Sequence, residues 1–102
     1  MTHKLIVNPE AEADLTLAKR WYDEKRSGLG SEFVTSVAEA FERIRLNPEL
    51  FGKVFHELRA ARVHHFPYLV IYRTDGTHVT IIAVYHTHRD PRGWQGRDES
   101  SN

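Results

Sequence analysis

Two Asn-Pro pairs delimit the part of the chain whose apolar residues recur with helical spacing. Asn8-Pro9 suits a helix start, because asparagine is a good N-cap and proline lacks the N–H that the first helical turn cannot use. Asn47-Pro48 ends the pattern, since the residue before a proline is steered away from α geometry. Residues 27–31, with two glycines, divide the stretch between them. The sequence therefore predicts a helix from about residue 9 to 26 and a second helix that ends near residue 46.

Both predicted helices are amphipathic, which indicates that each covers a core with one face. The stripe of the first helix consists of Ala11, Leu15, Ala18 and Tyr22, widened by Leu17 and Trp21. The stripe of the second consists of Phe33, Val37, Phe41 and Ile44, joined by Val34 and Ala40. We expect Trp21 and Tyr22 to pack in the core or between the helices.

The second half of the chain is β-prone. Strands are predicted over residues 55–65, 68–73 and 78–86, with reversals at Phe66-Pro67 and at residues 74–77. On the last strand, strict alternation places Val79, Ile81, Ala83 and Tyr85 opposite Thr80, Ile82, Val84 and His86.

These elements predict a two-layer α+β domain. We expect the three later strands to form an antiparallel sheet, residues 4–7 to join it as an N-terminal strand, and the helical hairpin to cover one face. A single domain is expected over residues 1–97, followed by a polar C-terminal tail at 98–102.

The composition excludes several classes of protein. The chain has no cysteine, which excludes disulfides and thiolate zinc sites. The histidine pair His86 and His88 has no acidic residue at a spacing typical of a metal site, so we expect neither a metal nor a cofactor. No apolar run approaches the roughly 20 residues that span a bilayer, and the first residues do not form a signal peptide. We therefore expect a cytoplasmic protein without a membrane partner.

Charge is balanced overall but segregated along the chain. The formal net charge is zero, which argues against strong non-specific attraction to nucleic acid. Residues 1–52 hold seven Lys/Arg and nine Asp/Glu, whereas residues 53–97 hold seven and three. After Lys53 every basic residue is arginine, which favours planar, bidentate contacts with carboxylates or phosphates. The second half therefore carries the candidate binding residues.

Six short motifs occur in the same order and spacing as in a known toxin family. They are Trp21-Tyr22, Glu57-Leu58-Arg59, Phe66-Pro67-Tyr68, Ile71-Tyr72-Arg73, Ala83-Val84 and His86-x-x-Arg89-Asp90-Pro91-x-x-Trp94-x-x-Arg97. Over residues 4–97 the sequence resembles RelE/ParE toxins. The resemblance implies a β-α-α-β-β-β fold and a bacterial type II toxin that a cognate antitoxin keeps inactive in a hetero-oligomer.

The resemblance leaves two activities open, because one fold serves both. RelE-like members cut messenger RNA on the ribosome and need cations and general acid/base groups around the scissile phosphate. Arg59, Arg73 and His86 are the candidates for that chemistry here, and a nuclease of this kind would be metal-independent. ParE-like members instead bind DNA gyrase and need only a binding surface.

The neutral charge, the scarcity of lysine, the Arg-Asp-Pro ending and the long first helix favour a non-enzymatic, ParE-like gyrase inhibitor. Candidate partner-binding residues are Arg59, Arg62, Arg73, Arg89, Arg92, Trp94 and Arg97. Structural roles compete for two of them. Trp94 can pack its indole on the sheet, and Arg89 can pair with Asp90 or Glu57. The arginines after residue 88 fit partner contacts better, since we expect them on an irregular segment.

Overall fold

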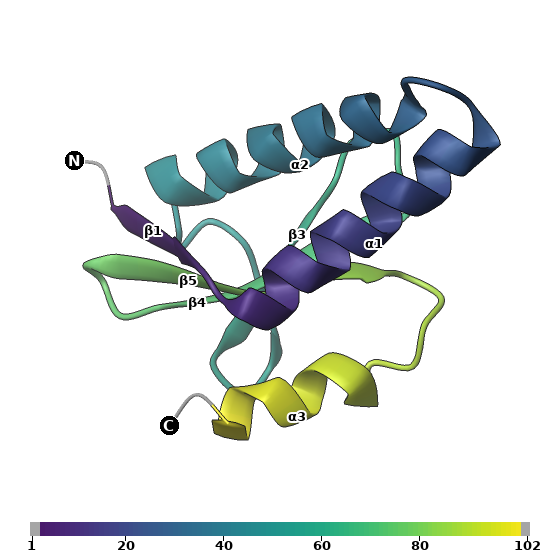
Figure 1. Ribbon diagram of the computed structural model, residues 1–102. Helices are drawn as coiled ribbons and strands as arrows, with labels where there is room; N and C mark the ends of the chain where they lie inside the picture. Colours follow the sequence, from purple (N-terminus) through teal and green to yellow (C-terminus); the bar gives the residue numbers. More distant parts are fainter. Residues whose placement is uncertain (1–2, 101–102) are drawn as a thin grey trace.

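The computed structural model describes residues 3–100, with side chains up to Arg97, and forms an α+β fold of two helical layers around a sheet (Figure 1). The elements follow in the order β1 (Lys4–Val7), α1 (Pro9–Lys25), α2 (Leu29–Leu46), β2 (Lys53–Phe55), β3 (Leu58–Arg62), β4 (Tyr68–Thr74), β5 (His78–His86) and α3 (Arg92–Ser100). The α+β class, the helical hairpin and its bounds are as the sequence predicts.

The sheet has the strand order β1-β5-β4-β3-β2 and is mixed. β1 runs parallel to β5, with Lys4 opposite His78 and Val7 opposite Ile81. The other neighbours are antiparallel. The prediction of a purely antiparallel sheet is therefore wrong for β1. β1 ends opposite Ile81, so within residues 3–100 the part of β5 after Ile81 has no strand beside it on the β1 side.

α1 and α2 form a hairpin over one face of the sheet (Figure 1). The Asn8 side chain makes no capping hydrogen bond, so the start of α1 rests on Pro9 and on the Asn8 carbonyl, which accepts from Glu12 N at 3.0 Å. Gly28 takes a left-handed φ of 89° between the helices, a conformation that costs glycine little. Gly30 N donates to Asp23 Oδ1 at 2.8 Å, which ties the two helices together.

The main core lies between this hairpin and the sheet. Tyr22, Phe33 and Phe66 are at its centre, with ring centroids 5.0 to 5.2 Å apart. Such tilted and edge-on aromatic pairs contribute beyond the area they bury. The buried members of this core are Ala11, Ala18, Tyr22, Phe33, Val37, Ala40, Ile44, Ala61, Val63, Val70, Tyr72, Val79, Ile81 and Val84.

A β-bulge in β5 overturns the predicted alternation of its side chains. Ile71 pairs with Ala83 whereas Tyr72 pairs with Ile81, which leaves Ile82 as an extra residue. Ala83 and Tyr85 therefore join Ile82 in a second cluster on the opposite face, instead of sharing a face with Ile81. The same shift brings Val84 to the face of the sheet that α1 and α2 cover.

Two further predictions need correction. The strand predicted over residues 55–65 is split into β2 and β3, because His56 adopts a left-handed φ of 53° and the chain reverses there. The arginine-rich ending is a helix and not an irregular segment: α3 lies on the sheet face opposite the hairpin (Figure 1). α3 continues past residue 97, into the predicted polar tail; residues 101–102 of that tail lie outside the described residues.

Tyr72 fastens the loop after α2 to the sheet. Its hydroxyl donates to the Pro48 carbonyl at 2.5 Å, and its side chain is fully buried. Burial raises the pKa of Tyr72 from 10.0 to about 12. The folded protein therefore keeps a proton that the unfolded chain loses, so we expect the free energy of unfolding to fall between about pH 10 and pH 12. Urea unfolding across this range tests the expectation; in Tyr72→Phe this component of the slope is expected to disappear.

Candidate functional site

The structure has a groove between α1 and the end of β5. It encloses about 680 Å³ and is lined by Asp14, Leu17, Ala18, Trp21, Tyr68, His86, His88, Arg89 and Arg97. We refer to it as the α1–β5 groove. Its position follows from the sheet, because β1 ends opposite Ile81 and leaves the rest of β5 beside α1. The β5 bulge decides that His86, like Val84, faces this side.

One wall of the groove is apolar and belongs to α1. Leu17 and Trp21 are one helical turn apart and therefore share a face of the helix. Their exposed fractions are 62% and 52%, which is high for residues of this size. The prediction that Trp21 packs in the core or between the helices is wrong, because its neighbour Tyr22 takes the inward position and is only 9% exposed. The Leu17–Trp21 spacing is the sequence signal that marks this second apolar face.

The opposite wall is cationic and comes from the segment that follows β5. His88 N donates to His86 Nδ1 at 3.0 Å, and Arg89 N donates to the His86 carbonyl at 3.1 Å, so a tight turn fixes this segment. Because Nδ1 of His86 accepts, its ring proton resides on Nε2. The Arg89 guanidinium lies 4.5 Å from the centre of the Tyr85 ring, a cation–π contact. The two carboxylates predicted as partners of Arg89 have other partners: Asp90 pairs with Arg92, and Glu57 pairs with Lys53.

An ion pair lies at one end of the groove. Arg97 binds Asp14 in a bidentate manner, with Nη1–Oδ2 and Nη2–Oδ1 distances of 2.7 and 3.1 Å. The two side chains are 21% and 10% exposed. The hydrogen bond to Asp14 raises the pKa of Arg97 further above its ordinary value. Since Asp14 neutralises Arg97, the positive charge offered to a ligand comes from Arg89.

A family model described as the ParE toxin of type II toxin-antitoxin systems, parDE, matches residues 5–91. The chain belongs to this family. It is a toxin of the type II toxin-antitoxin class, as the sequence motifs predict. Among curated proteins none matches the sequence.

Solved structures share the fold of this ParE-family toxin. The chromosomal ParDE system of P. aeruginosa superposes with a TM-score of 0.74 at 15% identity, covering 85% of this chain and 98% of that one. The YoeB dimer from Staphylococcus aureus gives 0.57 at 21% identity, with coverage of 84% and 99%. The YoeB–YefM complex from the same organism gives 0.56 at 20%, again with 84% and 99%. At these identities the likeness shows the fold alone.

The ParE-family toxin brings only three of the sequence-predicted residues into the groove: His86, Arg89 and Arg97. Arg59 donates to the Phe51 carbonyl at 2.6 Å. It lies on β3, which β4 separates from β5. Arg73 lies opposite Thr80, six residues along β5 from His86, which corresponds to about 20 Å. The predicted nuclease trio of Arg59, Arg73 and His86 therefore does not converge.

The remaining candidates lie outside the groove. Arg62 is exposed at the end of β3, beside His64 and His65. Arg92 is exposed on α3 and pairs with Asp90 at 2.6 Å. Trp94 is 6% exposed and packs against Phe55, with ring centroids 6.0 Å apart, so it has the packing role that competed with partner binding.

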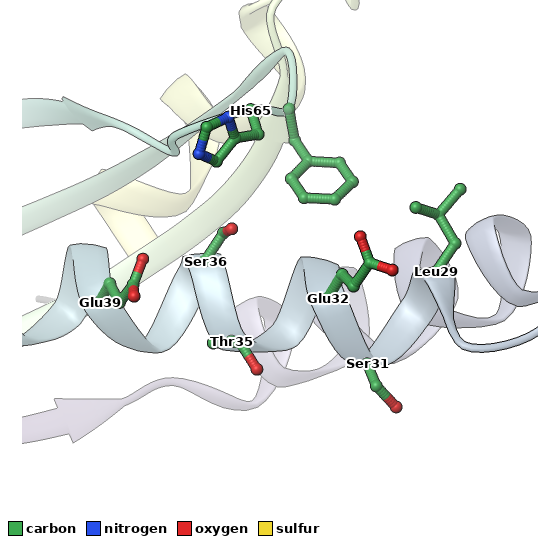
Figure 2. A pocket seen from close by; sticks show the side chains of 8 residues that line it. Leu29, Ser31, Glu32, Thr35, Ser36, Glu39 and His65 are labelled. Carbon is green, nitrogen blue, oxygen red and sulfur yellow. The ribbon is translucent and has the colours of Figure 1, made fainter.

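A second hollow of about 560 Å³ differs in charge from the α1–β5 groove. It runs between α2 and the reversal at residues 65–66, and Figure 2 shows Glu32 and Glu39 on the α2 side with His65 above Ser36. None of the predicted arginines lines it. In residues 3–100 no cluster of three His, Asp or Glu side chains could hold a metal ion. No helix in the same range has the length and apolar character needed to cross a membrane.

Proposed function

We propose that this ParE-family toxin arrests growth by binding DNA gyrase through the α1–β5 groove, without catalysing a reaction. The observation that carries the proposal is that Trp21 and Arg89, both exposed, line the same groove. Tryptophan and arginine are the residue types that dominate binding energy at protein interfaces. Arg59, Arg62, Arg73 and Arg92 are too scattered to act at the same contact and at most extend it.

We further propose that a cognate antitoxin neutralises the toxin in a hetero-oligomer. The relatives of known structure are described as a ParDE system and a YoeB–YefM complex. An antitoxin segment with acidic and apolar side chains would match the cationic and apolar walls of the α1–β5 groove. Since gyrase acts on chromosomal DNA, the proposed site of action is the cytoplasm.

Supercoiling of a relaxed plasmid by purified gyrase tests this function. We expect the purified toxin to inhibit supercoiling in proportion to its concentration, and we expect the antitoxin encoded beside it to restore supercoiling. Leu50→Ala is a suitable control variant because Leu50 is 69% exposed and does not line the groove, so it should inhibit like the wild type. Growth arrest in cells, combined with unaffected supercoiling in vitro, would reject gyrase as the target.

A ribosome-dependent messenger RNA endoribonuclease is the second candidate. The observation that favours it is the presence of His86, His88 and Arg89 in one groove, because a nuclease needs a proton-transfer group beside a cation. Primer extension on translated messages separates the two functions. New 5′ ends within seconds to minutes of toxin induction would support the nuclease, and intact messages in arrested cells would reject it.

A further inference from the structure

Side chains, and not a strand, close the edge of β5 beyond β1. The last backbone bond from the β1 side is made by Asn8 N, which donates to the Ile81 carbonyl at 3.0 Å. Farther along, Val84 N donates to Asp14 Oδ2 at 3.0 Å, and Arg97 Nη1 donates to the Ile82 carbonyl at 3.2 Å. The Asp14–Arg97 pair therefore joins α1, β5 and α3 at one point.

α3 depends on such contacts to stay in place. It has nine residues, including Gly93 and Gly96, and isolated helices shorter than roughly 12 residues are marginal in water. Among its residues with described side chains, Trp94, Arg97 and Gly93 contact the sheet. A Cβ at Gly93 would lie only 2.0 Å from the Tyr85 hydroxyl, so α3 packs directly against the Tyr85 side chain there.

The position of α3 is linked to the position of Arg89 through one aromatic ring. Arg89 and Arg97 both have their guanidinium carbons near the Tyr85 ring, at 4.5 and 5.6 Å from its centre. Tyr85 is only 6% exposed, since α3 covers it. If α3 leaves the sheet, it no longer covers the Tyr85 side chain or holds it in place. Arg89 then no longer packs against a fixed ring.

We infer that Asp14 and Arg97 are positioning residues, whose ion pair holds α3 on the edge of β5 and thereby fixes Arg89 at the mouth of the α1–β5 groove. The inference rests on the proposed function, in which this groove binds the target. The pair is suited to the role because it is mostly buried. Replacing Arg97 leaves the Asp14 carboxylate buried without its guanidinium partner, and replacing Asp14 removes the bidentate contact that Arg97 makes with α1. Both changes are unfavourable for the docked state of α3.

Trp94 emission and growth arrest test the inference together. The chain has two tryptophans, so Trp21→Phe leaves Trp94 as the only tryptophan and, under selective excitation of tryptophan, as a reporter of α3 docking. In that background we expect Arg97→Gln and Asp14→Asn to shift Trp94 emission to the red. In the chain that retains Trp21, each substitution is expected to weaken target binding, and the dose response of growth arrest, on the order of tenfold.

The double variant Asp14→Asn/Arg97→Gln separates positioning from a loss of charge alone. The amide oxygen introduced at position 14 can still accept from Val84 N, and no unpaired charge remains. We therefore expect the double variant to be closer to the wild type than either single variant. Arg45→Gln is the matched control: it breaks the Arg45–Glu42 ion pair on α2, which does not line the groove, and should change neither readout.

Three outcomes would overturn the inference: single variants with unchanged Trp94 emission and arrest, additive losses in the double variant, or single variants that no longer melt cooperatively. The last would make the pair a requirement of the whole fold. Because emission and growth arrest do not depend on which target is bound, they test the inference even if wild-type toxin leaves gyrase unaffected. Unaffected gyrase would reject only the proposed function.

Discussion

Replacing Arg89 with glutamate is expected to weaken inhibition of gyrase at least about 100-fold, the largest effect that we predict for a single surface substitution. Arg89 is exposed at the mouth of the α1–β5 groove, and its turn is fixed by hydrogen bonds to the carbonyl and the ring of His86. A glutamate there removes the cation and introduces repulsion toward the acidic groups that the groove is suited to bind. The concentration of toxin that halves supercoiling measures the effect directly.

The matched control for Arg89→Glu is Arg26→Glu. Arg26 is also exposed and forms an ion pair with Glu32 on the hairpin, outside the groove. Both variants change the net charge equally, so a general electrostatic effect would weaken both. Equal inhibition by Arg89→Glu and the wild type, with both folded, would place the target surface elsewhere on the molecule.

Gly30→Ala is expected to have the largest effect on stability, a loss of about 3 kcal/mol in the free energy of unfolding. A Cβ at Gly30 would lie 2.5 Å from the Lys19 carbonyl oxygen and 2.6 Å from Asp23 Cγ. The first of these is backbone in the middle of α1, so the two helices have to move apart. The movement also strains the bond from Gly30 N to Asp23. Melting followed by circular dichroism should show a decrease of more than roughly 10 °C in Tm.

Gly96→Ala provides the opposite control on α3. A Cβ at Gly96 meets no atom within 4 Å, and alanine in a helix is favoured over glycine by up to about 1 kcal/mol. We therefore expect Gly96→Ala to preserve or raise Tm. If Gly30→Ala and Gly96→Ala change Tm equally, the close approach of α1 and α2 does not require glycine at position 30.

Local signals account for the parts of the fold that the sequence predicts well. The Asn-Pro pairs set the bounds of the helical hairpin through backbone sterics that do not depend on the rest of the chain. The hairpin between β4 and β5 is equally local. Asp75 Oδ1 accepts from Thr77 N and His78 N, and Gly76 adopts a φ of 92°. These backbone bonds, His78 first, also lower the pKa of Asp75.

The start of α3 has a local signal in the sequence, although the irregular segment expected there is wrong. An Asp-Pro pair such as Asp90-Pro91 suits the start of a helix as well as a turn. Asp90 Oδ1 indeed accepts from Arg92 N at 3.0 Å where α3 begins. The two glycines that follow argue against a helix when only the local sequence is considered. Contacts of Trp94 and Arg97 with the rest of the fold override that preference.

The composition of the groove could not be predicted, because it depends on contacts between distant residues. Asp14 and Arg97 are 83 positions apart, and no local pattern links them. The single extra residue at Ile82 reverses which side of β5 faces the helices, and strict alternation cannot reveal it. The exposure of Trp21 likewise depends on where the sheet ends relative to α1.

The parallel pairing of β1 with β5 has a consequence for how the chain folds during synthesis. The helical hairpin can form as soon as its residues leave the ribosome, but Lys4 has no strand partner until His78 has been added. Pairings over such long separations form slowly. A translation product that stops before His78 lacks the strand on which both β1 and the groove depend. The chain therefore becomes a complete toxin only after β5, and with it one wall of the groove, has been synthesised.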